Sequence, residues 1–230
     1  MAMAETALII GAGAGLSASL ARKLSAEGFD VALAARNTEK LAPLAASTGA
    51  TLHECEASDI EAVAKLFAAL DTAGRAPSLA IYNPSFRTRG PITELDPVLV
   101  RRSLEVCAFG AFLVAQQAAR RMLAAGRGTI FLTGASAGVK GFPQSAPFAM
   151  GKFALRGLAE SLARELHPKN IHICHFVIDG GIASATRVAE AGGDALLDPD
   201  AIADAYLHVL HQPRSAWSSE LALRPWVEKF

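Results

Sequence analysis

Short runs of apolar residues alternate along this chain with longer segments in which apolar residues recur every three or four positions. The short runs predict buried strands, and the longer segments predict helices. Ser145 and Pro147 are typical of a helix cap and first turn. The predicted strands are 6–10, 31–34, 79–82, 129–132 and 171–178, and the predicted helices begin at Leu16 and lie near 38–46, 60–73, 97–124, 146–166 and 200–211.

This alternation of strand and helix predicts the fold class. Successive strands that are joined by helices form a parallel sheet with helices on both faces. We therefore predict an α/β fold of Rossmann type, with a doubly wound parallel sheet. The chain has 230 residues, of which 51% are hydrophobic, and shows no linker, repeat or low-complexity segment. Residues 1–230 are expected to form a single domain.

The first predicted strand runs directly into a glycine-rich turn. Gly11, Gly13 and Gly15 precede Leu16, where the helical pattern begins. Glycines let the backbone approach a pyrophosphate, and the free amides at the start of a helix direct partial positive charge at the anion. The strand, turn and helix together predict a dinucleotide-binding site that contains these four residues.

The end of the second strand indicates which dinucleotide is bound. A chain that selects NAD usually carries Asp or Glu there to bind the adenosine ribose, whereas this chain reads Ala34, Ala35, Arg36 and Asn37. The Arg36 guanidinium can pair with a 2′-phosphate. We therefore expect NADP(H) to be favoured over NAD(H), the alternative being that Arg36 is a solvated arginine at a strand end.

Composition and charge argue against several kinds of partner. Lys and Arg total 22, as do Asp and Glu, so no long-range field favours nucleic acid or an anionic membrane. Cys55, Cys107 and Cys174 lie far apart with no CxxC spacing, so neither a metal site nor a disulfide framework is expected. No basic segment precedes the first strand, and no stretch approaches the ~20 apolar residues that cross a bilayer. We expect a cytoplasmic protein.

Residues 180–199 form the long region that lacks strong periodicity. They follow the carboxyl end of a predicted strand, which is the edge at which open α/β sheets bind their ligands. We expect this segment to be a lid over a small-molecule substrate.

Several motifs resemble those of the short-chain dehydrogenases/reductases, and the similarity covers essentially the whole chain. Gly11 and Gly15 match the family's TGxxxGxG turn, with Ser17 in place of the last glycine. The resemblance implies a Rossmann-type fold and dinucleotide binding. Further family elements are matched by Asn83 (the NNAG element), by Asp59 (the acidic patch that faces the adenine), and by Gly180, Ile182 and Ser184 (the PGxxxT segment that cradles the nicotinamide).

The family's activity is carried by an Asn, a Ser, a Tyr and a Lys, and only the lysine is clearly matched here, by Lys152. Phe148 stands in the tyrosine position, Cys107 in the asparagine position, and Ala135, with Ser136 beside it, in the serine position. In the family the tyrosine protonates the carbonyl oxygen, and phenylalanine has no proton to give. The resemblance thus implies a catalytic site at Lys152, Ser136, Cys107 and Phe148 with non-standard chemistry, in which Lys152 also holds the nicotinamide ribose.

Two functions remain open from the sequence. The first is an NADP(H)-dependent oxidoreductase that acts on a small, mostly apolar carbonyl or enone substrate, with Ser136, Cys107, Tyr82 or Ser145 as the proton donor. The loss of polar groups at three family positions suggests a pocket with an apolar face. The second is a catalytically inactive sensor or subunit that binds NADP(H).

The two longest predicted helices, 97–124 and 146–166, carry more apolar residues than one buried stripe holds. Family members commonly pair through these helices, so we expect a homodimer or homotetramer. The residues that could not all face one sheet are Leu104, Phe112, Leu113, Phe153 and Leu162.

Overall fold

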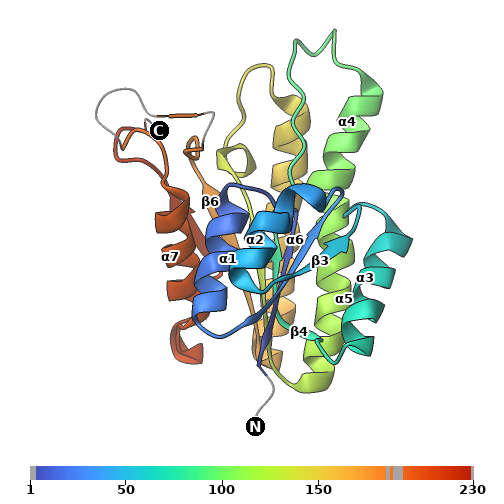
Figure 1. Cartoon of the computed structure of the whole chain (residues 1–230). Coiled ribbons are helices and arrows are strands. Elements are labelled where there is room, and N and C mark those ends of the chain that lie inside the picture. The colour runs from blue at the N-terminus through green and yellow to red at the C-terminus, as the bar shows by residue number, and fades with distance from the viewer. Residues whose placement is uncertain (1–3, 185–186, 189–193, 229–230) are drawn as a thin grey trace.

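A single parallel sheet of seven strands forms the centre of the molecule (Figure 1). The strands are β1 Thr6–Ile10, β2 Asp30–Ala35, β3 Thr51–Glu54, β4 Pro77–Tyr82, β5 Gly128–Thr133, β6 Ile171–Ile178 and β7 Glu220–Leu223. The computed structural model describes residues 4–184, 187–188 and 194–228. The strand order β3-β2-β1-β4-β5-β6-β7 reverses direction between β1 and β4. The carboxyl ends of these two strands therefore form the switch point where α/β sheets bind ligands.

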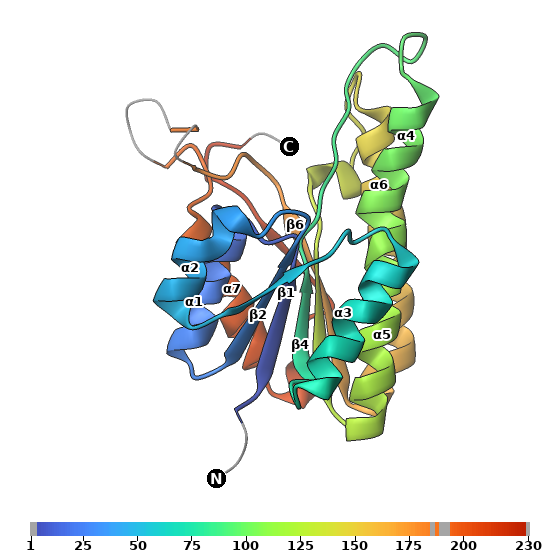
Figure 2. The same ribbon diagram turned by 45° about the vertical axis from the view of Figure 1, so that its right-hand side comes forward.

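Helices cover both faces of the sheet (Figure 2), which confirms the predicted doubly wound α/β fold. One face carries α1 Leu16–Ala26, α2 Ala42–Thr48 and α7 Pro199–Leu210. The other face carries α3 Ile60–Thr72, α4 Pro97–Leu104, α5 Gly110–Ala125 and α6 Ala146–Leu166. Short 3₁₀ segments lie at Glu39–Leu41, Ser136–Gly138, His167–Lys169 and Arg214–Ala216.

The sheet divides the hydrophobic core into two layers. Along β1, Leu8 and Ile10 face the layer packed by α3, α5 and α6, whereas Ala7 and Ile9 face the layer packed by α1 and α7. All five residues of β1 are buried. A central strand that is covered on both faces has no polar side, and this is why the sequence reads as an uninterrupted apolar run.

The two edge strands, β3 and β7, were not predicted. Each pairs with one neighbour only, β3 with β2 and β7 with β6. Their side chains are half-buried or exposed, and they include Thr51, His53 and Glu54 in β3 and Glu220 in β7. A strand at the edge of a sheet does not need two apolar faces, so the sequence lacks the run that marks the inner strands.

The predicted helix 97–124 is not one regular α-helix. A π-helical segment, Glu105–Phe109, separates α4 from α5. The Val106 carbonyl within it accepts a hydrogen bond from the buried Tyr82 hydroxyl. A side chain from the sheet thus satisfies a carbonyl inside the irregular turn, which gives the interruption a structural cause that helical periodicity does not reveal.

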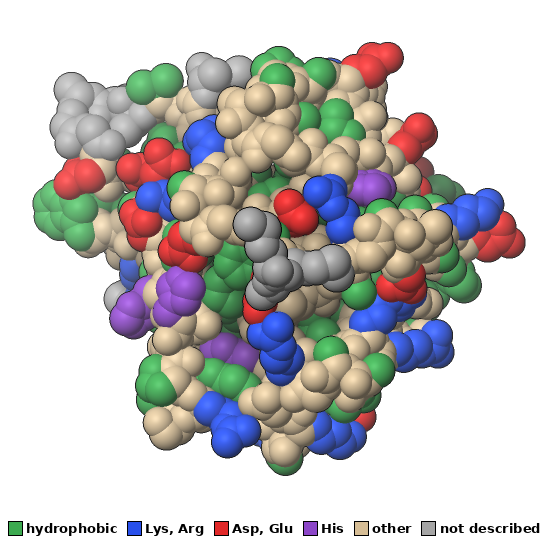
Figure 3. Space-filling model, turned by 60° about the horizontal axis from the view of Figure 1, so that its bottom comes forward, with side chains coloured by type: hydrophobic (Ala, Val, Ile, Leu, Met, Phe, Trp, Pro, Cys, Tyr) green, Lys and Arg blue, Asp and Glu red, His purple; other side chains and the backbone are tan. Residues whose placement is uncertain are grey.

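The surface seen when the lower end of the molecule in Figure 1 is turned forward carries both basic and acidic side chains (Figure 3). The net charge of the whole chain is zero. Within the described residues, no helix combines the length and apolar character that crossing a bilayer requires.

Candidate functional site

The glycine-rich turn between β1 and α1 is tied to the end of β2. The amides of Gly11 and Ala12 donate to the Ala34 carbonyl at 2.9 and 3.0 Å. Gly11 has a φ of +76°, and a Cβ there would lie 2.6 Å from the Pro84 nitrogen, so the position requires glycine. Gly15 is the N-cap of α1, and among the described residues no side chain caps the helix. The turn therefore keeps backbone donors available to an anion.

A cavity of about 600 Å³ opens beside this turn at the switch point. Its lining includes Gly11 and Ala12 from the turn, Arg36 and Asn37 after β2, and Asn83 after β4. Arg36 is exposed and, within the described part of the chain, makes no ion pair. A planar cation without a carboxylate partner suits an anionic group of a bound dinucleotide.

Asn83 positions the glycine-rich turn. Its Nδ2 donates to the Ser17 Oγ at 2.7 Å, and the Ser17 hydroxyl donates to the Gly11 carbonyl at 3.2 Å. Ser17 occupies the place of the last glycine in the turn motif. The serine thus links the turn to the end of β4, which gives this departure from the motif a role in the structure.

A second cavity, of about 330 Å³, adjoins the first and shares Asn83 and Ser85 with it. Its lining comes from the carboxyl ends of β4, β5 and β6 and from the first turns of α6. The two cavities together follow the carboxyl edge of the sheet. The predicted residues that line the second cavity are Asn83, Ala135, Ser136, Phe148, Lys152, Gly180 and Ile182.

Lys152 is a buried cation with few partners. Its side chain lines the second cavity although the residue is only 2% exposed, and its Nζ donates to the Thr133 carbonyl at 2.8 Å. Burial lowers the pKa of the ammonium, and the interaction with Cys107 raises this pKa by a smaller amount. An ammonium has three N–H donors, and one is used by Thr133. The remaining donors fit hydroxyl groups such as those of a nicotinamide ribose.

Phe148 and Lys152 lie one turn apart on α6 and contact each other. The Lys152 Nζ lies 5.8 Å from the centroid of the Phe148 ring, and the Arg87 guanidinium carbon lies 5.0 Å from it. Phe148 is 8% exposed and packs with Cys107, Ala137 and the partly buried Ala135. The Phe148 ring therefore contacts two cationic side chains at the position that the resemblance assigned to a tyrosine.

Three of the four proton donors suggested by the sequence lie outside the cavity. Tyr82 is fully buried, its hydroxyl is bonded to Val106, and burial raises its pKa. Cys107 is fully buried with its Sγ 3.5 Å from the Phe86 carbonyl. Ser145 is buried, and its hydroxyl has no partner within the described structure, so the predicted side-chain cap of α6 does not form. Ser136 alone of the four lines the cavity.

Five predicted cofactor residues line neither cavity. Gly13 and Gly15 belong to the turn beside the first cavity but are not among its lining residues. The Asp59 carboxylate accepts a hydrogen bond from the Ala62 amide at 2.7 Å and caps α3. Leu16 is buried in the core beneath α1. Ser184 is exposed and bridges to Arg187.

The predicted lid at 180–199 is described only in part. Ile182 pairs with Leu197 through a short bridge, so the two ends of this segment lie together. Residues 185–186 and 189–193 lie outside the described part of the chain.

Sequence reasoning missed Arg87 and Arg187, both of which line the second cavity. Arg87 follows β4 by five residues, at the carboxyl edge where ligands bind, so its place in the sequence could have identified it as a candidate site residue. Arg187 lies about 100 residues further along, and no local pattern connects the two. The lining also contains Phe142, Phe148 and Ile178, so the apolar face stays a prediction, and the structure adds Lys152 and two arginines beside it.

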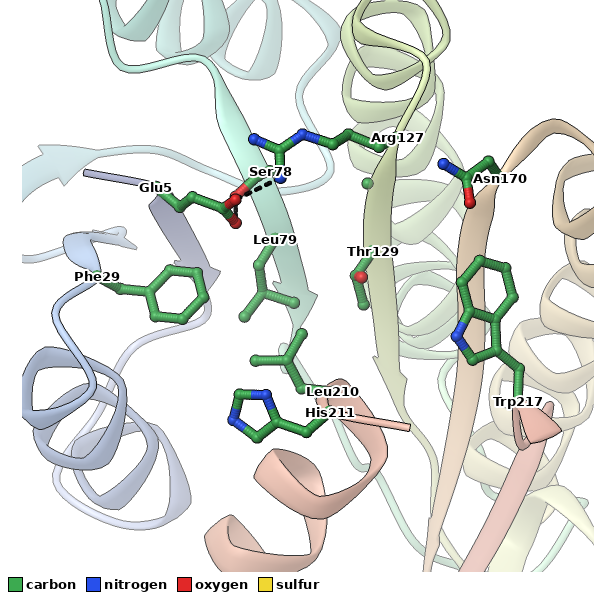
Figure 4. A pocket seen from close by; sticks show the side chains of 11 residues that line it. Glu5, Phe29, Ser78, Leu79, Arg127, Thr129, Asn170, Leu210, His211 and Trp217 are labelled. Carbon is green, nitrogen blue, oxygen red and sulfur yellow. Dashed lines mark hydrogen bonds and ion pairs between the residues drawn. The ribbon is translucent and has the colours of Figure 1, made fainter. Parts of the chain in front are cut away.

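A separate pocket of about 300 Å³ lies at the opposite edge of the sheet (Figure 4). It is lined by residues at the amino ends of the strands, and the ion pair between Glu5 and Arg127 borders it. Trp217 and His211 also line it. Because it is remote from the switch point, this pocket does not belong to the site at the carboxyl edge.

Comparison with known proteins agrees with this geometry. Residues 5–192 match the family model described as short chain dehydrogenase. A trans-4-hydroxycyclohexanecarboxylate dehydrogenase from Sinomonas cyclohexanicum is 31% identical over 181 residues, which cover 74% of this chain and 69% of that protein. An L-2,3-butanediol dehydrogenase from Corynebacterium glutamicum is 28% identical over 183 residues, covering 73% of this chain and 68% of that one.

Solved structures show the same relationship. A short-chain dehydrogenase from Rhodopseudomonas palustris is 37% identical with a TM-score of 0.85, covering 96% of this chain and 99% of its own. A metagenomic short-chain oxidoreductase in complex with NADP is 26% identical with a TM-score of 0.83, covering 97% and 98%. The chain therefore belongs to the short chain dehydrogenase family of NAD(P)-dependent oxidoreductases.

Proposed function

We propose that this chain is an NADP(H)-dependent oxidoreductase in which Lys152, and not a tyrosine, is the general acid. The observation that carries the proposal is a buried ammonium that lines the cavity at the switch point, with one hydrogen bond to Thr133. The sequence resemblance adds that Phe148, one helical turn away, stands in the tyrosine position. A buried lysine without a carboxylate partner is costly for stability, and perturbed titratable groups of this kind cluster at functional sites.

Each residue of the proposed site has a separate role. The bound cofactor supplies or accepts the hydride. The start of α1 offers free amides to its phosphates, and Arg36 offers a guanidinium to a 2′-phosphate. Lys152 holds a proton at its Nζ, and burial makes this group a stronger acid than an exposed lysine. Ser136 lines the same cavity, and in this proposal its hydroxyl binds the substrate oxygen.

The competing function is a non-enzymatic NADP(H) sensor or subunit. Phe148 and Ala135 favour it, because the family's tyrosine and serine are both absent. The retention of Lys152 within an open cavity favours the enzyme.

We expect the wild-type protein to oxidise NADPH in the presence of at least one compound from a panel of ketones, aldehydes and enones. The variant Phe148→Tyr/Ala135→Ser is expected to gain no ketone reduction, because Cys107 still occupies the asparagine position and Arg87 contacts the ring at position 148. The loss of NADPH absorbance measures the turnover rate of the wild type and of the double variant. Tight NADPH binding without turnover of any compound would support the sensor, and ketone reduction by the double variant alone would indicate a damaged site of the usual kind.

The cofactor preference depends on Arg36. A charge-assisted hydrogen bond contributes about 1.5–3 kcal/mol, so Arg36→Ala is expected to weaken NADPH binding by roughly 10- to 100-fold and to leave NADH binding nearly unchanged. Titration of each cofactor by fluorescence gives the dissociation constants. Arg120→Ala, which removes an exposed arginine from α5 outside both cavities, is the matched control. Equal affinity of the wild type for NADPH and NADH would contradict this assignment.

Self-association stays a prediction. Phe109, Phe112 and Phe153 are each more than 40% exposed on the π-helical segment, α5 and α6, which supports an apolar contact between copies of the chain. Leu113, in contrast, is buried within the protomer.

A further inference from the structure

The cavity beside Lys152 has an unbalanced charge. Among the described residues, its lining contains Lys152, Arg87 and Arg187 and no aspartate or glutamate. The whole chain has equal numbers of acidic and basic residues, so this excess of cations is local. Like charges that share a cavity repel one another, and an anion between them would relieve the repulsion.

The two arginines converge on the cavity from different parts of the chain. The Arg87 guanidinium lies over the Phe148 ring, 5.0 Å from its centroid. The Arg187 side chain packs over Gly181, where a Cβ would lie 3.3 Å from the arginine Nη1. The pKa of Arg87 is lowered, first by partial burial and then by the positive charges of Arg89 and Arg187. Arg87 and Arg187 are thus close enough to influence each other.

The lack of a carboxylate partner distinguishes these two residues from most arginines in the protein. Within the described part of the chain, neither Arg87 nor Arg187 makes an ion pair. Both side chains are exposed, and each is therefore accessible to a ligand. Ion pairs with carboxylates are formed by Arg22, Arg75, Arg101, Arg102, Arg121, Arg127, Arg156, Arg164 and Arg224.

We propose that the substrate is a small organic acid whose carboxylate is held by Arg87 and Arg187, while its reacting carbon lies deeper, beside Lys152. Guanidinium groups bind carboxylates through paired, charge-assisted hydrogen bonds, and they would fix the orientation of the substrate from the mouth of the cavity. This inference rests on the proposed function, because it names the substrate class of the same site. It adds a carboxylate to the small, mostly apolar substrate that the sequence suggested.

The experiment compares acids with their neutral amides. Benzoate and benzamide, pentanoate and pentanamide, and 3-phenylpropanoate and 3-phenylpropanamide are titrated by calorimetry into protein that is saturated with NADP⁺. We expect the acid to bind at least about tenfold more tightly than the amide in one or more pairs. Equal affinity in all three pairs, or no detectable binding of any acid, would overturn the proposal.

Variants identify the groups that recognise the acid. Arg87→Gln and Arg187→Gln are each expected to weaken acid binding by about tenfold or more and to leave amide binding unchanged. Arg89→Gln is the matched control, because Arg89 is a neighbouring exposed arginine that does not line the cavity. Unchanged acid binding in both Arg87→Gln and Arg187→Gln would also overturn the proposal.

A separate titration distinguishes the substrate from the phosphates of the cofactor. The dissociation constant for NADPH is expected to stay within about twofold of the wild-type value in Arg87→Gln and Arg187→Gln, since both residues line the second cavity and not the first. A large loss of NADPH affinity would assign these arginines to the cofactor instead. Because the readout is binding, acid recognition without turnover would refute the proposed function alone, and turnover without acid preference would refute this inference alone.

Discussion

Replacing Lys152 by methionine is expected to lower the rate of NADPH-dependent reduction by about 10²- to 10⁴-fold, the usual contribution of a positioned general acid. Methionine has a similar length and an apolar side chain, so it suits the buried site next to Phe148. The variant loses the ammonium that donates to Thr133 and lines the cavity. The value of kcat, measured on the panel compound that the wild type reduces fastest, checks the expectation.

The pH dependence provides a second readout for the same residue. Burial lowers the pKa of Lys152 below its ordinary value of 10.5, because the charged form is disfavoured away from water. As an acid, the protonated form is active, so the reduction rate should fall as the pH rises through this lowered pKa. The methionine variant should lack that step. The control is Lys169→Met, at a half-exposed residue after α6. If Lys152→Met keeps the wild-type rate, another group, such as Ser136, donates the proton.

Gly110→Ala is expected to destabilise the protein by about 3 kcal/mol, the upper part of the usual range for overpacking a core. A Cβ at Gly110 would lie 2.4 Å from the Tyr82 Oη and 2.5 Å from the Ala57 carbonyl oxygen. Neither neighbour can move easily, since Tyr82 is fully buried and bonded to Val106, and the second contact is with backbone. Urea unfolding of the cofactor-free protein measures the free-energy change.

Gly13→Ala is the matched control for this substitution. No atom lies within 4 Å of a Cβ at Gly13, so the same change should leave the free energy of unfolding nearly unaltered in the absence of cofactor. Equal stability of the two variants would mean that the close approach of α5 to β4 is relaxed in solution.

The inner part of the fold could be predicted because burial on both faces produces an unambiguous pattern. Strands β1 and β6 are buried along their whole length, and their apolar runs follow directly from that environment. The edge strands lie half in solvent, where Thr51 or Glu220 is acceptable, so their residues do not differ from those of a loop. The π-helical segment could not be predicted either, because its cause is a hydrogen bond from a distant tyrosine.

The site could be predicted where its residues are local to one element. The turn from Gly11 to Gly15, Arg36 at a strand end, and the pair Phe148 and Lys152 on one helix are all set by spacing along the chain. Properties that depend on tertiary neighbours could not be predicted. Asp59 serves its own helix as a cap, and Ser145 is a cap position whose hydroxyl makes no bond to the helix.

The π-helical segment also determines where the α4–α5 rod can change in length. A π-helical turn holds about one residue more than an α-helical turn, so loss of one residue from Glu105–Phe109 would leave a regular helix with α5 still in phase with α4. An α-helix turns by about 100° per residue, so the same deletion at the start of α5 would rotate the rest of that helix by about that angle, and the buried side chains of Leu113 and Val114 would leave the core. The extra residue of the π-helical turn is therefore the one length change that this wall of the core can absorb.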